Sequence, residues 1–178
     1  MACLRRGPPV TFCVWLLSGL RANVGLMKSD ALPYSYRDDP DVPEFDAPVC
    51  FTVMDAQCAI CARGAKWIAR NDRAGEFRII PLQSPTGSAL MRHYGLDPRD
   101  PSSWLYVEEG RAYASMDAII RVGKRLGGRW RALGLLRVLP RMVQDRLYYT
   151  FARYRYRLSG RADLCSLPDP EVQKRLLQ

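Results

Sequence analysis

The chain has 178 residues, of which 48% are hydrophobic, enough to bury the core of one domain with extensions. It carries 27 Lys and Arg against 18 Asp and Glu, a formal net charge of +9. The six cysteines lack the dense, regular spacing of a small secreted disulfide scaffold, which argues against that class. One close pair plus scattered single cysteines favours a reducing compartment, so we expect a cytoplasmic protein.

Residues 1–46 are expected to form an irregular N-terminal segment. Two arginines precede an apolar run over residues 10–17, as in a secretory signal, but Arg21 interrupts the pattern and no convincing cleavage site follows. The run is also shorter than the roughly 20 apolar residues that span a bilayer. We favour Met27 as the true start. A genuine targeting segment over residues 1–26 would instead indicate a membrane-associated or exported protein.

The middle of the chain predicts an α/β domain over residues 47–127. Its hydrophobic patterns follow the order strand–helix–strand–helix–strand–strand–helix. The first two strands are expected to be parallel with a helical crossover, and the last two to form a hairpin around Glu109 and Gly110. This is the order of the thioredoxin fold. The strands are expected at 48–54, 77–82, 103–107 and 111–114, and the helices at 58–72, 84–94 and from a Ser115 cap to Gly127.

Residues 128–178 predict a C-terminal helical extension. One helix is expected over 129–138, broken at Pro140, and a second carries an apolar stripe that we expect to pack on the sheet. From Arg111 to Arg161 there are thirteen basic residues, against Asp117 and Asp145. We favour a solvated arginine-rich surface, while an anionic membrane surface or nucleic acid remain alternative partners. The stripe consists of Val143, Leu147, Tyr148, Phe151 and Tyr154.

The residues with the clearest chemistry are Cys58 and Cys61, at the turn from the first strand into the first helix. A helix N-terminus favours an anion, and the thiolate is the nucleophilic form of cysteine. We expect Cys58 to attack a substrate disulfide and Cys61, one turn further and more buried, to resolve the mixed disulfide. Asp55 is either a proton acceptor for Cys61 or a cap of the turn, and capping is favoured.

The pattern Asp55-x-x-Cys58-x-x-Cys61 resembles the signature of the DCC family of thiol-disulfide oxidoreductases. Further blocks resemble that family over about residues 36–178, including Phe77–Ser84, Asp117-Ala118, Arg129–Arg131, Leu139–Arg141 and the stretch from Arg155 to Cys165. The resemblance implies a thioredoxin-like fold and thiol–disulfide exchange with a protein or small-molecule substrate. It implies an external thiol reductant and no bound cofactor or metal. One departure is Ala56, where the family has glycine; a positive φ there would cost about 1 kcal/mol or more.

Two further residues are accessory candidates. Thioredoxin-like sites place a proline opposite the cysteine pair, and Pro101 is the nearest candidate. Cys165 is either a third thiol near the pair or a packing residue. The alternative function is a metal-binding, membrane-associated or nucleic-acid-associated module that uses Cys58 and Cys61 with Cys165 and the basic helices.

A zinc site is disfavoured because only one Cys-x-x-Cys pair is present and four ligands are needed. Cys50, Cys165 and His93, the sole histidine, would have to complete the set. Cys50 is instead expected to be a small buried hydrophobic residue, and His93 a surface or interface residue. We therefore favour the redox hypothesis over metal binding and over an inactive structural module.

Overall fold

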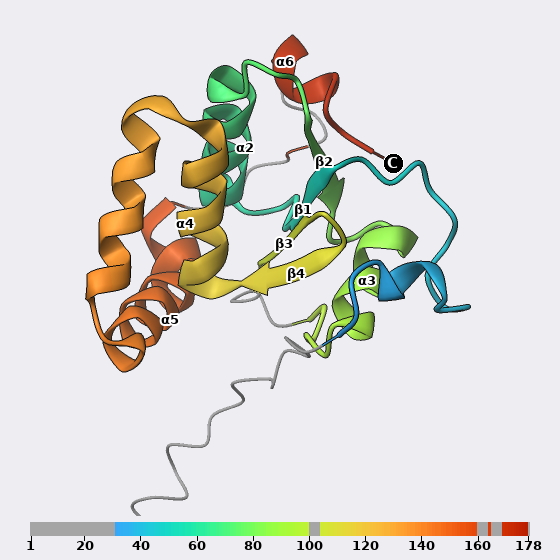
Figure 1. Cartoon of the computed structure of the whole chain (residues 1–178), viewed down its shortest axis with the longest axis horizontal. Coiled ribbons are helices and arrows are strands. Elements are labelled where there is room, and N and C mark those ends of the chain that lie inside the picture. The colour runs from blue at the N-terminus through green and yellow to red at the C-terminus, as the bar shows by residue number, and fades with distance from the viewer. Residues whose placement is uncertain (1–30, 100–103, 160–163, 165–168, 178) are drawn as a thin grey trace, which may run out of the picture.

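A mixed four-stranded sheet forms the centre of the protein (Figure 1). The computed structural model describes residues 31–99, 104–159, 164 and 169–177. The strands are β1 (Cys50–Met54), β2 (Phe77–Pro81), β3 (Leu105–Glu108) and β4 (Arg111–Ala114). Their order in the sheet is β2-β1-β3-β4, with β1 parallel to β2 and antiparallel to β3, and β3 antiparallel to β4.

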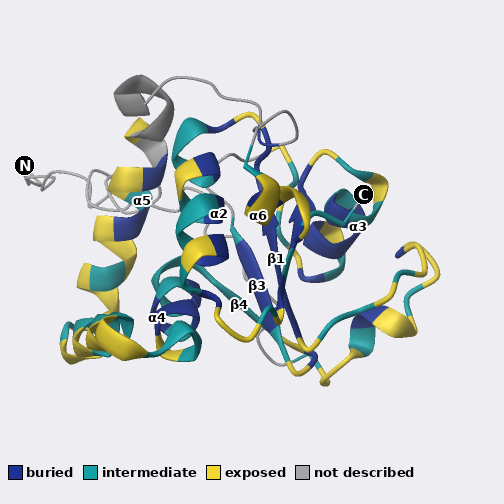
Figure 2. Cartoon of the chain, turned by 90° about the horizontal axis from the view of Figure 1, so that it is seen from above, coloured by how far each residue is buried: buried dark blue, intermediate teal, exposed yellow. Residues whose placement is uncertain are grey.

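Helices cover both faces of this sheet. They are α2 (Ala59–Asn71), α3 (Pro85–His93) and α4 (Ser115–Leu126). Figure 2 shows α2 and α4 on one side of the sheet and α3 on the other. The chain order is therefore the predicted strand–helix–strand–helix–strand–strand–helix, and the thioredoxin-like fold is confirmed.

β1 is buried along its whole length, because helices pack on both of its faces. Cys50 and Met54 lie in the core with α2 and α4, whereas Phe51 and Val53 lie in the core with α3. This alternation follows from the period of two in a strand. The one polar residue, Thr52, satisfies its hydroxyl by donating to the Leu105 carbonyl oxygen at 3.0 Å.

The hairpin between β3 and β4 turns where the sequence predicts, but the start of α4 differs. Glu109 (φ 50°) and Gly110 (φ 74°) both have positive φ, as a tight hairpin turn requires. The expected Ser115 cap is wrong: Ala114 occupies the N-cap position and no side chain caps the helix. The physical reason is that β4 runs directly into α4, so Ser115 (φ 55°) makes the change of direction as the first helical residue.

The C-terminal extension forms an outer layer on α2 and α4. It contains η2 (Gly128–Val138), α5 (Arg141–Ser159) and α6 (Pro170–Gln173). The segment expected as an ordinary helix over 129–138 is a 3-10 helix that packs against α4. Two glycines within η2, Gly128 and Gly134, lower its preference for α-helix. The expectation that the α5 stripe packs on the sheet is wrong, because α5 packs on α2 and α4 and leaves most of the stripe exposed.

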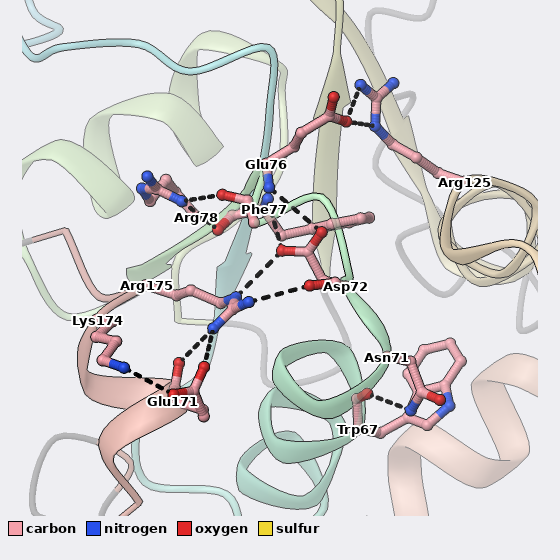
Figure 3. A network of polar contacts seen from close by, with 11 residues as sticks. Trp67, Asn71, Asp72, Glu76, Phe77, Arg78, Arg125, Glu171, Lys174 and Arg175 are labelled. Atoms are coloured by element: carbon pink, nitrogen blue, oxygen red, sulfur yellow. Dashed lines mark hydrogen bonds and ion pairs between the residues drawn. The ribbon is translucent and has the colours of Figure 1, made fainter.

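The C-terminal tail returns to the sheet beside β2. Leu176 bridges in parallel to Ile79, whose N–H donates to the Arg175 carbonyl oxygen at 2.7 Å. Arg175 is fixed by a buried ion pair with Asp72, at 3.1 Å between Nε and Oδ2 (Figure 3). The same carboxylate accepts the N–H of Phe77 at 3.1 Å, so one charge pair joins the tail, the end of α2 and the start of β2.

The lead-in to the domain also contributes to the core. Residues 31–46 contain one short 3-10 helix, η1 (Ser35–Arg37), and bury Tyr36 against the rings of Phe45 and Phe51. The domain boundaries at residues 47 and 128 stay predictions, although contacts cross both. Within the described part of the chain, none of the helices combines the length and the apolar character needed to cross a membrane.

We predict that Arg175→Ala lowers the free energy of unfolding by about 3–5 kcal/mol, because it leaves the buried Asp72 carboxylate without its cation. Urea denaturation measures the change. The neighbouring Lys174→Ala is the matched control: Lys174 pairs with Glu171 at the surface, and its loss should cost at most about 1 kcal/mol. Equal effects of the two substitutions would contradict the structural role of the buried pair.

Candidate functional site

The Cys-x-x-Cys motif lies at the carboxyl end of β1, the central strand. After Met54 the chain turns through Asp55, Ala56 and Gln57, and Cys58 is the N-cap of α2. The Cys58 backbone is extended (φ −102°, ψ 120°), as is usual at an N-cap. The predicted position of the cysteine pair at the strand-to-helix turn is therefore what the structure has.

The Cys58 sulfur caps the first turn of α2. It accepts the backbone N–H of Cys61, with 3.4 Å between the nitrogen and the sulfur. This is the position at which helix N–H groups lack intrahelical partners and at which the helix dipole stabilises negative charge. The contact therefore stabilises Cys58 more as a thiolate than as a thiol.

The expected order of burial of the two cysteines is wrong. Cys58 is fully buried and Cys61 is partly exposed, whereas the sequence suggested the reverse. Cys58 follows the carboxyl end of the buried strand β1, next to Asp55 and Ala56, which are buried as well. Cys61, already inside the helix, packs at the edge of the core formed by α2 and α4.

Asp55 is held by hydrogen bonds at the base of the motif. Its side chain is buried, and Oδ1 accepts the Gln57 backbone N–H at 2.9 Å and the Gln83 side-chain amide at 2.8 Å. The first contact is the capping role favoured for this residue. A proton-acceptor role toward Cys61 stays a prediction.

Gln83 is a site residue that sequence reasoning did not find. It follows β2, and its amide donates to Asp55 Oδ1 while its carbonyl oxygen accepts the Ala56 N–H at 3.0 Å. Both halves of one amide are thus used to fix the turn before Cys58. The available signal was its position after the second strand, since the ends of parallel neighbouring strands meet at one edge of a sheet.

Ala56 is not strained. The described non-glycine residues with positive φ are Tyr34, Glu109 and Ser115, so the condition under which Ala56 would carry strain does not arise. Its carbonyl oxygen accepts the N–H of Leu164 at 2.7 Å, and Leu164 is fully buried in the same core. The C-terminal extension therefore contacts the motif directly.

The structure describes some of the remaining candidate residues and does not describe others. Cys50 is a buried core residue, as expected, and burial raises its pKa to about 12. His93, the last residue of α3, is an interface residue, one of the two expected possibilities: Nε2 lies 2.9 Å from Ser35 Oγ in η1 and Nδ1 lies 2.5 Å from Asp39 Oδ2. Pro101 and Cys165 lie outside the described residues. Among the residues that the structure does describe, no group of three or more His, Cys, Asp or Glu side chains is placed to hold a metal ion.

Fold and motif together define a thioredoxin-like protein with a cysteine pair capping the first helix after the central strand. Residues 52–161 match the family model described as DCC1-like thiol-disulfide oxidoreductase. The chain belongs to this family, which supports a role as a thiol-disulfide oxidoreductase.

Two curated proteins are similar to the chain. The "Uncharacterized protein YuxK" of Bacillus subtilis is 33% identical over 125 residues, which cover 70% of this chain and 91% of that protein. The "DCC family protein At1g52590, chloroplastic" of Arabidopsis thaliana is 30% identical over 147 residues, covering 82% of this chain and 84% of that protein. No solved structure matches the chain.

We predict that Gln83→Ala loosens the turn before Cys58 and lowers the free energy of unfolding by about 1–2 kcal/mol, since Asp55 and the Ala56 N–H each lose a hydrogen bond. Urea denaturation measures this loss. Gln57→Ala is the matched control, because Gln57 is exposed and only its backbone contacts Asp55. A Gln83 variant as stable as the Gln57 variant would show that the amide does not hold the turn.

We also predict that Cys50 resists alkylation by iodoacetamide in the folded protein at about pH 8, because the thiolate is the reactive form and burial raises the Cys50 pKa to about 12. Mass spectrometry of peptides after alkylation, with and without urea, measures this protection. Cys61 is the internal reference because it is partly exposed. Modification of folded Cys50 at the rate of Cys61 would contradict the prediction.

The raised pKa of Cys50 also predicts how the contribution of this thiol to stability changes with pH. An unfolded cysteine has a pKa of about 8.5, so the folded chain keeps the Cys50 proton to higher pH than the unfolded chain does. The contribution of this thiol to stability is therefore complete below about pH 8.5 and is lost as the pH rises toward about 12.

Proposed function

We propose that this protein is a thiol-disulfide oxidoreductase of the protein-disulfide reductase type that works through Cys58 and Cys61. The observation that carries the proposal is the hydrogen bond from the Cys61 N–H to the Cys58 sulfur at the N-terminus of α2. A thiol in that position is stabilised as a thiolate, the form that attacks disulfides. The family match supports the same class of chemistry.

The proposed reaction transfers two electrons to a substrate disulfide. The Cys58 thiolate attacks one substrate sulfur, which forms a mixed disulfide and releases the other substrate sulfur as a thiolate that takes up a proton. Cys61 then loses its proton and attacks Cys58, which forms the Cys58–Cys61 disulfide and releases the second substrate thiol. An external dithiol or two molecules of a thiol such as glutathione reduce the enzyme again by the same exchange.

The buried position of Cys58 sets a requirement on this mechanism. Its side chain is fully buried, so a substrate sulfur reaches it only if the structure around the first turn of α2 opens locally. Cys61 is partly exposed and gives up its N–H contact when Cys58 moves. In this scheme Asp55 holds the turn through Gln57 and takes the Cys61 proton during resolution.

We further propose that the enzyme works as a reductase in the cytoplasm, on disulfides of proteins or small molecules. The supporting observation is that the chain has one close cysteine pair and scattered single cysteines, without the dense, regular spacing of a disulfide scaffold. Thiol pools in a reducing compartment keep such cysteines reduced and supply the electrons for turnover.

The decisive experiment is a redox titration of the full chain in glutathione buffers of graded ratio, with free thiols counted and the disulfide located by mass spectrometry. We expect two thiols to be lost reversibly as a Cys58–Cys61 disulfide, and Cys58→Ser and Cys61→Ser each to abolish it. Cys50→Ala is the matched control and should titrate like the natural chain. A pair that fails to oxidise reversibly, or stoichiometric zinc in the purified protein, would falsify the proposed function.

The order of attack has a separate test. Cys61→Ser lacks the resolving thiol, so it should accumulate a mixed disulfide at Cys58 with a disulfide substrate such as oxidised glutathione. Cys58→Ser should accumulate little. The reverse result would assign attack to the partly exposed Cys61 and resolution to Cys58.

A further inference from the structure

The outer side of α5 carries an apolar surface that the redox site does not use. Five of its side chains are between 41% and 84% exposed. They recur at spacings of one, three and four residues, which places them on one side of a helix. We call them the α5 face: Met142, Val143, Leu147, Phe151 and Tyr154.

The α5 face is not the side by which the helix joins the fold. Tyr148 and Ala152 are buried, at 6% and 3% exposed, and α5 contacts α2 and α4. At about 100° per residue these two positions point away from the α5 face. The helix is therefore anchored by one side and presents a second, larger apolar side outward, as the exposed residues of α5 in Figure 2 show.

The α5 face borders an open pocket. Its residues line a groove of about 970 Å³ together with Arg146 and Thr150. The preceding η2 exposes two more large apolar side chains, Leu135 and Val138, which are 73% and 84% exposed. Soluble monomers rarely expose this many neighbouring large apolar side chains without a partner.

The charges on η2 and on the first half of α5 are nearly all positive, and Arg146 lines the α5 pocket itself. Five exposed arginines lie on η2 and α5 between residues 128 and 151, and Asp145 is the acidic residue in that span. Some of this charge is used within the fold, since Arg137 pairs with Asp117 at 3.2 Å. The five arginines are Arg129, Arg131, Arg137, Arg141 and Arg146.

The presence of both apolar and positively charged side chains distinguishes between the possible partners of the α5 face. A second copy of the chain would bring two faces of net positive charge together, and like charges oppose association. Nucleic acid offers phosphates for the arginines but no hydrocarbon for Met142 and Leu147. An anionic lipid surface accepts both, because apolar side chains enter the acyl region while arginines stay at the head groups.

We propose that the α5 face docks on membranes that contain anionic lipids, with α5 lying in the plane of the interface. The proposal concerns the location of the protein and is independent of the redox chemistry at Cys58 and Cys61. The apolar side chains supply the insertion, and the arginines supply attraction that falls with ionic strength.

The test is co-sedimentation of the full chain with vesicles of phosphatidylcholine alone and of phosphatidylcholine mixed with phosphatidylserine. We expect binding to the mixed vesicles and at least about tenfold weaker binding to the neutral ones. The double variant Leu147→Ser with Phe151→Ser should bind the mixed vesicles about tenfold or more weakly. Both residues are half exposed, so this variant should keep its fold, as circular dichroism would show.

Matched controls distinguish the contribution of the inserted apolar side chains from that of electrostatic attraction by the arginines. Leu32→Ser removes a leucine outside α5 that is more exposed than Leu147 (77% against 52%), and this variant should bind as the natural chain does. Arg141→Gln with Arg146→Gln should weaken binding and reduce its dependence on salt, whereas Arg63→Gln on α2 should change neither.

Three outcomes would overturn the proposal. One is failure of the full chain to bind the mixed vesicles. Another is binding that the Leu147/Phe151 variant leaves unchanged, which would reduce the contact to charge alone. The third is a dimer in sedimentation velocity, or binding to an RNA or DNA oligonucleotide, that the same variant abolishes while vesicle binding persists.

Discussion

The structure depends on a central strand that is buried on both of its faces. β1 pairs with β2 on one edge and β3 on the other, while α2 and α4 cover one face and α3 the other. A strand enclosed in this way can meet a substrate only at its ends, and in open α/β sheets ligands bind at the carboxyl ends of the strands. The chain leaves β1 there through Asp55, and the cysteine pair begins α2 three residues later. Burial of β1 thus sets the position of the chemistry.

The C-terminal extension belongs to the same architecture, even though the thioredoxin order is complete without it. Leu164 contacts Ala56 inside the motif, and the Arg175–Asp72 ion pair fastens the tail to the junction of α2 and β2. Breaking a buried charge pair is costly, so the tail is held at both places. The extension is therefore joined both to the turn that carries the motif, through Leu164, and to the junction of α2 and β2, through Arg175.

The proposed redox site and the proposed membrane contact lie on two helices that pack together. α2 follows its N-cap Cys58 and contacts α5, whose outer side is apolar and carries Arg146. This helix pair therefore carries two surfaces of different character: the polar, hydrogen-bonded turn of the proposed redox site, and an apolar face with a positive charge. Docking through α5 would leave the sheet and its hairpin free, since both lie on the other side of α2 and α4 (Figure 2).

The sequence by itself determined the element order, the hairpin turn and the place of the cysteine pair, because these follow from local periodicity, glycine chemistry and capping preference. It also determined that Cys50 is buried, since β-branched and aromatic neighbours surround it. Only the tertiary structure decided that Cys58 is enclosed, that Gln83 holds Asp55, that Leu164 meets Ala56 and that the α5 stripe faces outward. Each of these depends on which surfaces meet across many residues of sequence, and an amphipathic pattern shows that a helix has an apolar side without showing what covers it.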